Sequence, residues 1–214
     1  MGFRGLGAAV GLAVLVCAAA AGAGGEHARR LAADIAVMEG DAHALLDPAT
    51  AEVHKRGLRA RLGGGLSTLG LLIRLAGQEN PRLGPAPPDA VGSLRAALER
   101  GDGLGLAKGL GALARLYPFD ATGILPATAT PARLGRGRQI HQDICAGCHD
   151  APDLETPRPA FNLFERTRAL PAGEFAARLV AGVRGDNLMS LQNPLSDEEM
   201  ASLIAFYRQG APKD

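Results

Sequence analysis

Two cysteines and a histidine within one short segment are the residues of this chain best suited to chemistry. Cys145 and Cys148 are separated by two residues, and His149 follows directly. On a short helical turn, thiols at this spacing can each reach one vinyl group along one edge of a porphyrin, and an imidazole at the next position can ligate the iron. This spacing is the attachment pattern of a c-type haem. We therefore predict one covalently attached haem c, with His149 as a ligand of its iron.

The same residues have other interpretations: a chance pair of cysteines, a disulfide, half of a zinc site or a redox dithiol. Zinc is held by about four ligands, and the only other cysteine is Cys17, far away near the N terminus. A redox dithiol needs no histidine at this position and is more typical of a strand followed by a helix. The sequence therefore favours haem attachment over these alternatives.

Length and composition indicate the class of fold. The chain has 214 residues, a length that allows one large domain or two small ones. Its formal net charge is +1. Tryptophan is absent and glycine, alanine and leucine are abundant, which favours closely packed helices over a β-sandwich. We predict an all-α fold, and the balanced charge gives no argument for a nucleic-acid partner.

The first 23 residues are typical of an export signal. Arg4 supplies a positive start, residues 6–20 are apolar, and residues 21–23 (Ala-Gly-Ala) offer a small-residue cleavage site. An uncleaved membrane anchor is the first alternative. Lipidation at Cys17 is the second, disfavoured because bulky Val16 precedes it. Each interpretation places the chain outside the cytoplasmic membrane, and we predict a periplasmic protein, where a stray thiol would be a liability.

Residues 26–125 carry no motif that we recognise and are predicted to form a small helical bundle of unknown role. Helices are expected near residues 28–38, 58–73, 89–100 and 104–116. Asp47 before Pro48 looks like a helix N-cap. The glycines at 63–65 either break the second helix or allow another helix to approach closely.

Three histidines and a methionine in this region could in principle hold a second haem or a metal. They are His27, His43, His54 and Met38. Their spacings are irregular, so we expect surface or helix-end residues rather than ligands. Residues 117–130, with two prolines and Gly123, are predicted to be a linker. We place the domain boundary near residue 126, with a haem domain over 126–214.

From Pro131 onward the chain resembles the class I c-type cytochromes, which are small helical electron carriers. In that family a helix opens with glycine, an aromatic residue follows four positions later, and the first haem cysteine comes four after that. Gly137, His141 and Cys145 keep this spacing, with His141 where Phe or Tyr is usual. Thr130 before Pro131 is expected to cap this helix. We expect His141 to pack at a helix crossing rather than to bind the iron.

The resemblance also implies further residues around the haem. A proline carbonyl in the loop after the motif accepts a hydrogen bond from the proximal histidine, and Pro159 is the best candidate, with Pro157 second. Met189, forty residues after His149, is where the family places its distal ligand. Met200 lies on the final helix, expected over 195–209, and is predicted to be core. Phe161, Leu163 and Phe164 are candidates to pack on the haem edge, and Ser196 with Glu199 should form a capping box.

An iron with histidine and methionine on its two faces has no place for a substrate. The resemblance therefore implies a carrier of single electrons between redox protein partners, not an enzyme. One alternative is a haem enzyme or a gas or redox sensor in which Met189 is easily displaced. Another is a cytochrome subunit docked to a larger redox complex through its N-terminal helices. A membrane is a partner only if the signal segment is retained.

Overall fold

The computed structural model describes residues 25–156, 159–182 and 194–209. Helices dominate these residues, and their only β-type pairing is an isolated bridge between Thr122 and Leu125. The predicted all-α class is confirmed for this part of the chain. The helices are α1 (Glu26–Leu46), α2 (Glu52–Glu79), α3 (Ala90–Glu99), α4 (Gly103–Leu116), α5 (Pro131–Ile140), a π-helical turn (His141–Cys145), α6 (Ala146–His149), α7 (Leu163–Ala169), α8 (Ala172–Ala181) and α9 (Asp197–Gln209).

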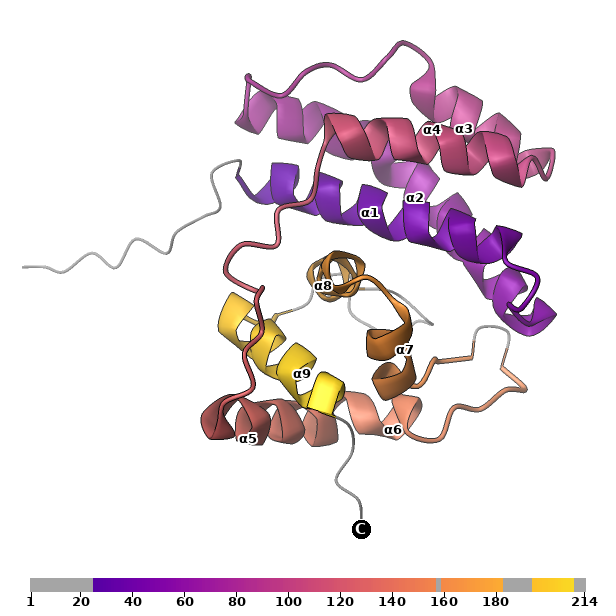
Figure 1. Cartoon of the computed structure of the whole chain (residues 1–214). Coiled ribbons are helices and arrows are strands. Elements are labelled where there is room, and N and C mark those ends of the chain that lie inside the picture. Colours follow the sequence, from indigo (N-terminus) through magenta and orange to yellow (C-terminus); the bar gives the residue numbers. More distant parts are fainter. Residues whose placement is uncertain (1–24, 157–158, 183–193, 210–214) are drawn as a thin grey trace, which may run out of the picture.

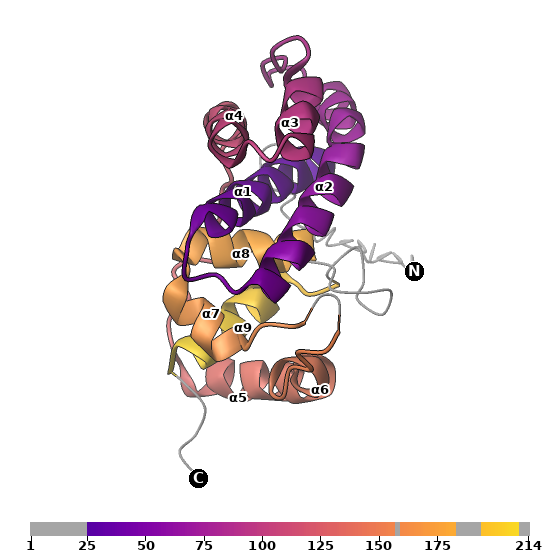
Figure 2. The same cartoon turned by 90° about the vertical axis from the view of Figure 1, so that its right-hand side faces the viewer.

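The helices are stacked in layers along the molecule (Figure 1). Helices α3 and α4 lie at one end, followed by α1 and α2, then by α8. Helices α7 and α9 come next, and α5 with α6 lies at the other end. In the second view the N-terminal end of α2 reaches down to the level of α7 (Figure 2). No helix among the described residues is both long enough and apolar enough to cross a membrane.

Helices α1 to α4 form the expected bundle around a leucine-rich core. Helix α1 is longer than predicted and ends at Leu46. The sequence predicts Asp47 as the N-cap of the next helix, but this prediction is wrong. Asp47 is the C-cap of α1. The reason is Pro48, which disfavours helical backbone in the residue before it. The Asp47 side chain accepts a hydrogen bond from the backbone of Ala49 (2.8 Å), and the next helix starts at Glu52.

Helix α2 runs unbroken through its three consecutive glycines. Leu62, Leu66 and Leu69 on this helix are fully buried in the bundle core. A Cβ atom at Gly65 would lie 2.7 Å from the sulfur of Met38 on α1. Of the two interpretations of the glycine run, close helix approach is therefore the one that the structure supports.

The C-terminal helices are held by the caps and crossing that the sequence predicts. Thr130 caps α5 by accepting from the backbone of Arg133 (3.2 Å). Ser196 and Glu199 form the capping box of α9, with Ser196 N donating to Glu199 at 2.9 Å. Gly137 on α5 faces α9 so closely that a Cβ there would overlap the carbonyl of Ser202. Met200 is buried in the core, as predicted.

The N-terminal bundle and the C-terminal helices pack directly on each other through α1 and α8. Ala33 and Val37 on α1 meet Ala177 and Ala181 on α8, and all four are buried. The connection over residues 117–130 contains no helix, as expected of a linker. It is nevertheless packed, because its Ile124 is buried in the core around α9. The bundle and the C-terminal helices therefore share continuous apolar contacts.

Candidate functional site

The Cys-x-x-Cys-His segment spans the π-helical turn and α6. The π-helical turn comes from a hydrogen bond between the backbone N–H of Ala146 and the carbonyl of His141, and such turns are frequent at functional sites. Cys145 is half-buried, Cys148 is exposed, and both are free thiols. The disulfide interpretation of the pair thus finds no support in this structure. Both sulfurs are available for covalent bonds.

His149 has one ring nitrogen occupied by a backbone acceptor. Its Nδ1 lies 2.6 Å from the carbonyl oxygen of Phe161. A carbonyl only accepts, so Nδ1 carries the proton, and Nε2 is the nitrogen left to bind a metal. In the part of the chain that the structure describes, no group hydrogen-bonds to this Nε2. The ring is therefore oriented and in the tautomer that a metal ligand needs.

The identity of that acceptor corrects one prediction. Pro159 was expected to supply the carbonyl for His149, but the carbonyl belongs to Phe161, two residues later. Asn162 is the N-cap of α7 and accepts from the backbone of Glu165 (3.1 Å), which fixes the chain at Phe161 beside His149. Pro159 itself is buried. Pro157 and Met189 lie outside the described residues.

His141 forms hydrogen bonds on both sides of its ring. Its Nδ1 lies 3.0 Å from the hydroxyl of Tyr207, and its Nε2 lies 3.0 Å from a carboxylate oxygen of Asp150. Because the carboxylate accepts from Nε2, a neutral His141 accepts from Tyr207 through Nδ1. Tyr207 on α9 and Asp150, the residue after His149, are thus connected through one buried histidine.

His141 also fills the aromatic position of the helix crossing, as expected. Its ring makes edge contacts with Phe164 and Tyr207 and a tilted contact with Phe206. Only 4% of its surface is exposed. Packing and hydrogen bonding together agree with the prediction that His141 is a structural residue rather than a ligand.

The site favours neutral forms of the groups near the first cysteine. Burial raises the pKa of the Cys145 thiol, and the nearby Asp150 carboxylate adds to this effect. Burial also raises the pKa of Tyr207, with a further contribution from Cys145. Both groups are therefore uncharged at neutral pH.

Comparison with models of protein families, with curated proteins and with solved structures gave no match.

The sequence missed the participation of the N-terminal bundle in this site. His54 near the start of α2 stacks on the ring of Phe161, with ring centroids 4.2 Å apart and planes inclined by 22°. The guanidinium carbon of Arg166 on α7 lies 4.5 Å from the centroid of the same ring. Nothing in the local sequence links residue 54 to residue 161, because the contact depends on how α1 packs against both α2 and α8.

Among the residues that the structure describes, the other histidines of the bundle make no contact with this site. His43 is exposed, and His27 lies 3.5 Å from Glu79 at the start of α1. Across the described ranges, no three or more histidine, cysteine, aspartate and glutamate side chains are grouped so that they could hold a metal ion. The zinc interpretation therefore gains no support from these residues.

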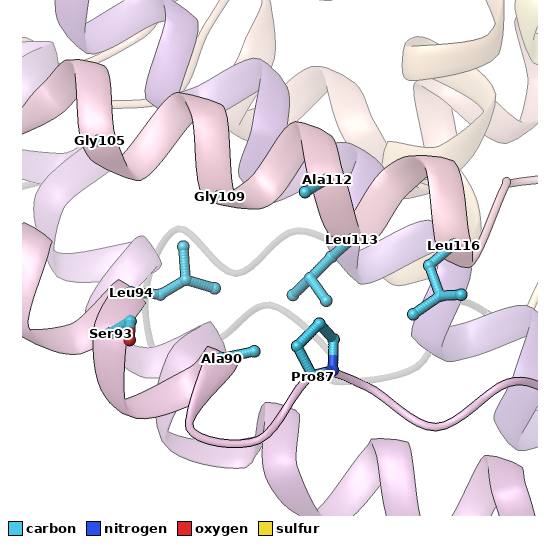
Figure 3. A pocket seen from close by; sticks show the side chains of 9 residues that line it. All are labelled: Pro87, Ala90, Ser93, Leu94, Gly105, Gly109, Ala112, Leu113 and Leu116. Carbon is cyan, nitrogen blue, oxygen red and sulfur yellow. The ribbon is translucent and has the colours of Figure 1, made fainter.

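One apolar hollow lies elsewhere, between α3 and α4 (Figure 3). Only Ser93 brings a polar side-chain group to it, and Gly109 on α4 allows the close approach of Leu94 on α3. The hollow carries no ligating or nucleophilic group that the site could use. Its lining is Pro87, Ala90, Ser93, Leu94, Gly105, Gly109, Ala112, Leu113 and Leu116.

Proposed function

We propose that this chain is a periplasmic monohaem c-type cytochrome that carries single electrons between redox proteins. The observation that supports this most strongly is the state of His149. Its Nδ1 is engaged by the Phe161 carbonyl, which leaves Nε2 to bind iron, and two free thiols lie on the same segment. The donor set therefore fits a covalently attached haem c.

Each residue of the motif has a separate task in this proposal. Cys145 and Cys148 hold the porphyrin through two thioether bonds, and His149 ligates the iron from one face. The Phe161 carbonyl keeps the imidazole oriented and makes it a stronger donor. Tyr207, His141 and Asp150 hold the C-terminal end of the motif in place. These residues position the group, while reversible one-electron oxidation is the chemistry that the haem iron supplies when bound.

Met189 is proposed as the ligand on the opposite face. A thioether there stabilises the ferrous state and raises the reduction potential. With both faces filled, the protein binds no substrate at the iron and acts as a carrier rather than an enzyme. Methionine ligation has a weak charge-transfer absorption in the ferric state. Carbon monoxide binding to the ferrous form at neutral pH would instead favour a haem enzyme or sensor.

The function is tested by producing the full chain in a bacterial host that attaches haem c. We expect a periplasmic protein whose haem stays on the polypeptide in acidic acetone and whose N terminus begins near residue 24. The double variant Cys145→Ala/Cys148→Ala should lose all covalent haem, since no thiol of the motif is left to bond the porphyrin. His43→Ala changes an exposed histidine outside the motif, and this variant should retain its covalent haem.

The outcome that would contradict the proposal is equally direct. A wild-type protein without pigment, or with pigment that acidic acetone removes, would rule out a c-type cytochrome. Holoprotein that is reduced and oxidised reversibly by one electron would support the carrier role. Donor and acceptor proteins would then be sought by their electron exchange with the purified holoprotein.

A further inference from the structure

The starting observation is that Phe161 is contacted by side chains from two other elements. The His54 ring from α2 stacks on it, and the Arg166 guanidinium from α7 lies against it. His54 is half-buried in this contact. Burial lowers the pKa of His54, and the charge of Arg166 lowers it further. The stacked imidazole is therefore neutral near neutral pH, so its contact with Phe161 is between two uncharged rings.

The backbone of Phe161 also contacts His149. Its carbonyl accepts the hydrogen bond from Nδ1 of His149 at 2.6 Å. A hydrogen bond to the far nitrogen of a ligating histidine fixes the ring and raises its basicity, and loss of such a partner typically costs about 10–100-fold in metal affinity or activity. The position of the Phe161 carbonyl therefore affects how strongly the His149 imidazole donates electrons to a bound metal.

We propose that His54 is a positioning residue through which the N-terminal bundle sets the electronic properties of the haem. His54 holds the Phe161 ring, the Phe161 backbone holds the His149 imidazole, and the strength of that last hydrogen bond sets the reduction potential. This proposal rests on the function proposed above. It also gives residues 26–125 a role, since no other described histidine of the bundle stacks on a residue that contacts His149.

The sign of the effect follows from the chemistry of the ligand. A strong Nδ1–H···O bond pushes electron density toward Nε2 and favours the ferric state. Without the His54 ring, Phe161 has more freedom and the hydrogen bond weakens. The iron then receives less electron density, and the reduction potential shifts to more positive values. The Nδ1 proton of His149 also exchanges faster with solvent.

The experiment compares four variants with wild type as holoproteins. His54→Ala removes the ring, and His54→Leu keeps apolar bulk without a ring in case the alanine variant folds poorly. His54→Phe restores a flat ring in the same place. His43→Ala is the matched control, because His43 is an exposed histidine of the same bundle. The measurements are the midpoint potential and, in the ferrous protein, the exchange rate of the His149 Nδ1 proton by NMR.

We expect a positive shift of the potential and faster proton exchange in His54→Ala and His54→Leu. His54→Phe and His43→Ala should match wild type in both measurements. An unchanged potential and exchange rate in both ring-less variants would overturn the proposal, as would an equal shift in His54→Phe. A wild-type chain without covalent haem would overturn the proposed function and this inference together. A haem-loaded wild type that is indifferent to His54 would overturn this inference alone.

Discussion

His141 shows how one residue can serve both packing and polarity at this site. Its ring takes the place of an aromatic side chain between Phe164 and Tyr207. Unlike phenylalanine, it also bonds to Tyr207 and Asp150 through its two nitrogens. Buried polar groups are stabilising only when their hydrogen bonds are made. The histidine is satisfied at both nitrogens, so its burial is consistent with a stable fold.

Substituting His141 should separate these two contributions. His141→Phe keeps the ring but loses two hydrogen bonds, each worth about 0.5–1.5 kcal/mol, so the free energy of unfolding should fall by about 1–3 kcal/mol. His141→Ala also leaves a cavity and should lose about 3 kcal/mol or more. Urea unfolding followed by circular dichroism measures both. A phenylalanine variant as stable as wild type would show that the hydrogen bonds add nothing.

At this scale the sequence was informative about residue types but not about partners. The Cys-x-x-Cys-His spacing and the packing role of His141 follow from short-range patterns. The acceptor for His149 was assigned to Pro159 because the family resemblance supplies a proline, while the chain places the Phe161 carbonyl there. Backbone carbonyls are present in every residue, so no sequence signal distinguishes one from the next.

Among the elements, the crossing of α5 and α9 holds the helix that leads into the Cys145–His149 segment. Gly137 brings the two helices together, and a side chain at this position would meet the backbone carbonyl of Ser202 and the Cβ of Phe206. Backbone atoms cannot move aside as the end of a flexible side chain can. The space at Gly137 is therefore filled by α9 itself.

Two alanine substitutions on α5 should have opposite effects. Gly137→Ala should lower the free energy of unfolding by about 1–3 kcal/mol, because overpacking displaces the helices. Gly135→Ala has open space around the new methyl group, and it should raise stability by up to about 1 kcal/mol through helix propensity. Chemical denaturation of both variants measures the difference. Equal effects at the two glycines would contradict the close crossing.

Helix positions were largely predictable because their signals are local. The Thr130 and Ser196 caps and the leucine spacing of α2 lie within a few residues of the features that they predict. The prediction for Asp47 is wrong because an aspartate before a proline is compatible with a helix start as well as with a helix end. Pro48 instead stops α1, and the helix that follows begins only at Glu52.

At the scale of the whole molecule, a buried ionic cluster connects the N-terminal bundle to α8. Asp41 on α1 has no exposed surface and accepts hydrogen bonds from Arg61 on α2 at 2.5 Å and from Arg178 on α8 at 2.8 Å. Arg178 also donates to Glu174 at 2.6 Å. Two acidic and two basic groups thus balance in charge. Burial alone would raise the pKa of Asp41, but the two arginines outweigh it and hold the pKa below its usual value.

Removing the Asp41 charge should weaken the whole fold. Asp41→Asn leaves two arginines without their shared partner, and breaking a buried pair in this way typically lowers the free energy of unfolding by about 3–5 kcal/mol. The folded state binds the Asp41 proton more weakly than the unfolded chain does. The contribution is therefore complete above the ordinary pKa of 3.8 and is lost as the pH falls through the lower pKa of the folded protein.

The pH profile provides the test. Urea midpoints measured from about pH 5 down to about pH 2.5 should fall more steeply in wild type than in Asp41→Asn. Asp34→Asn is the control, because burial raises the pKa of Asp34, and the loss of stability in acid should persist in it. Parallel profiles for wild type and Asp41→Asn would contradict the role of Asp41.

Neither the ionic cluster nor the His54 contact can be predicted from the sequence alone. Asp41 and Arg178 are 137 positions apart, and charged residues on amphipathic helices are usually solvated. Their burial depends on how α1 packs against α8, and a chain with no recognised pattern over residues 26–125 gives no sign of this. Long-range packing, rather than local propensity, decides these contacts.

The packed connection between α4 and α5 has a consequence for any protein that binds this chain. Tyr117 donates to the carbonyl of Gly84 at 2.9 Å, and Phe119 contacts the clusters around both α8 and α9. A connection anchored along its path does not behave as a flexible tether. A protein that binds the bundle would therefore meet the Cys145–His149 segment at a fixed distance and orientation. If the chain carries electrons as proposed, the face on which a partner docks would determine the rate of electron transfer.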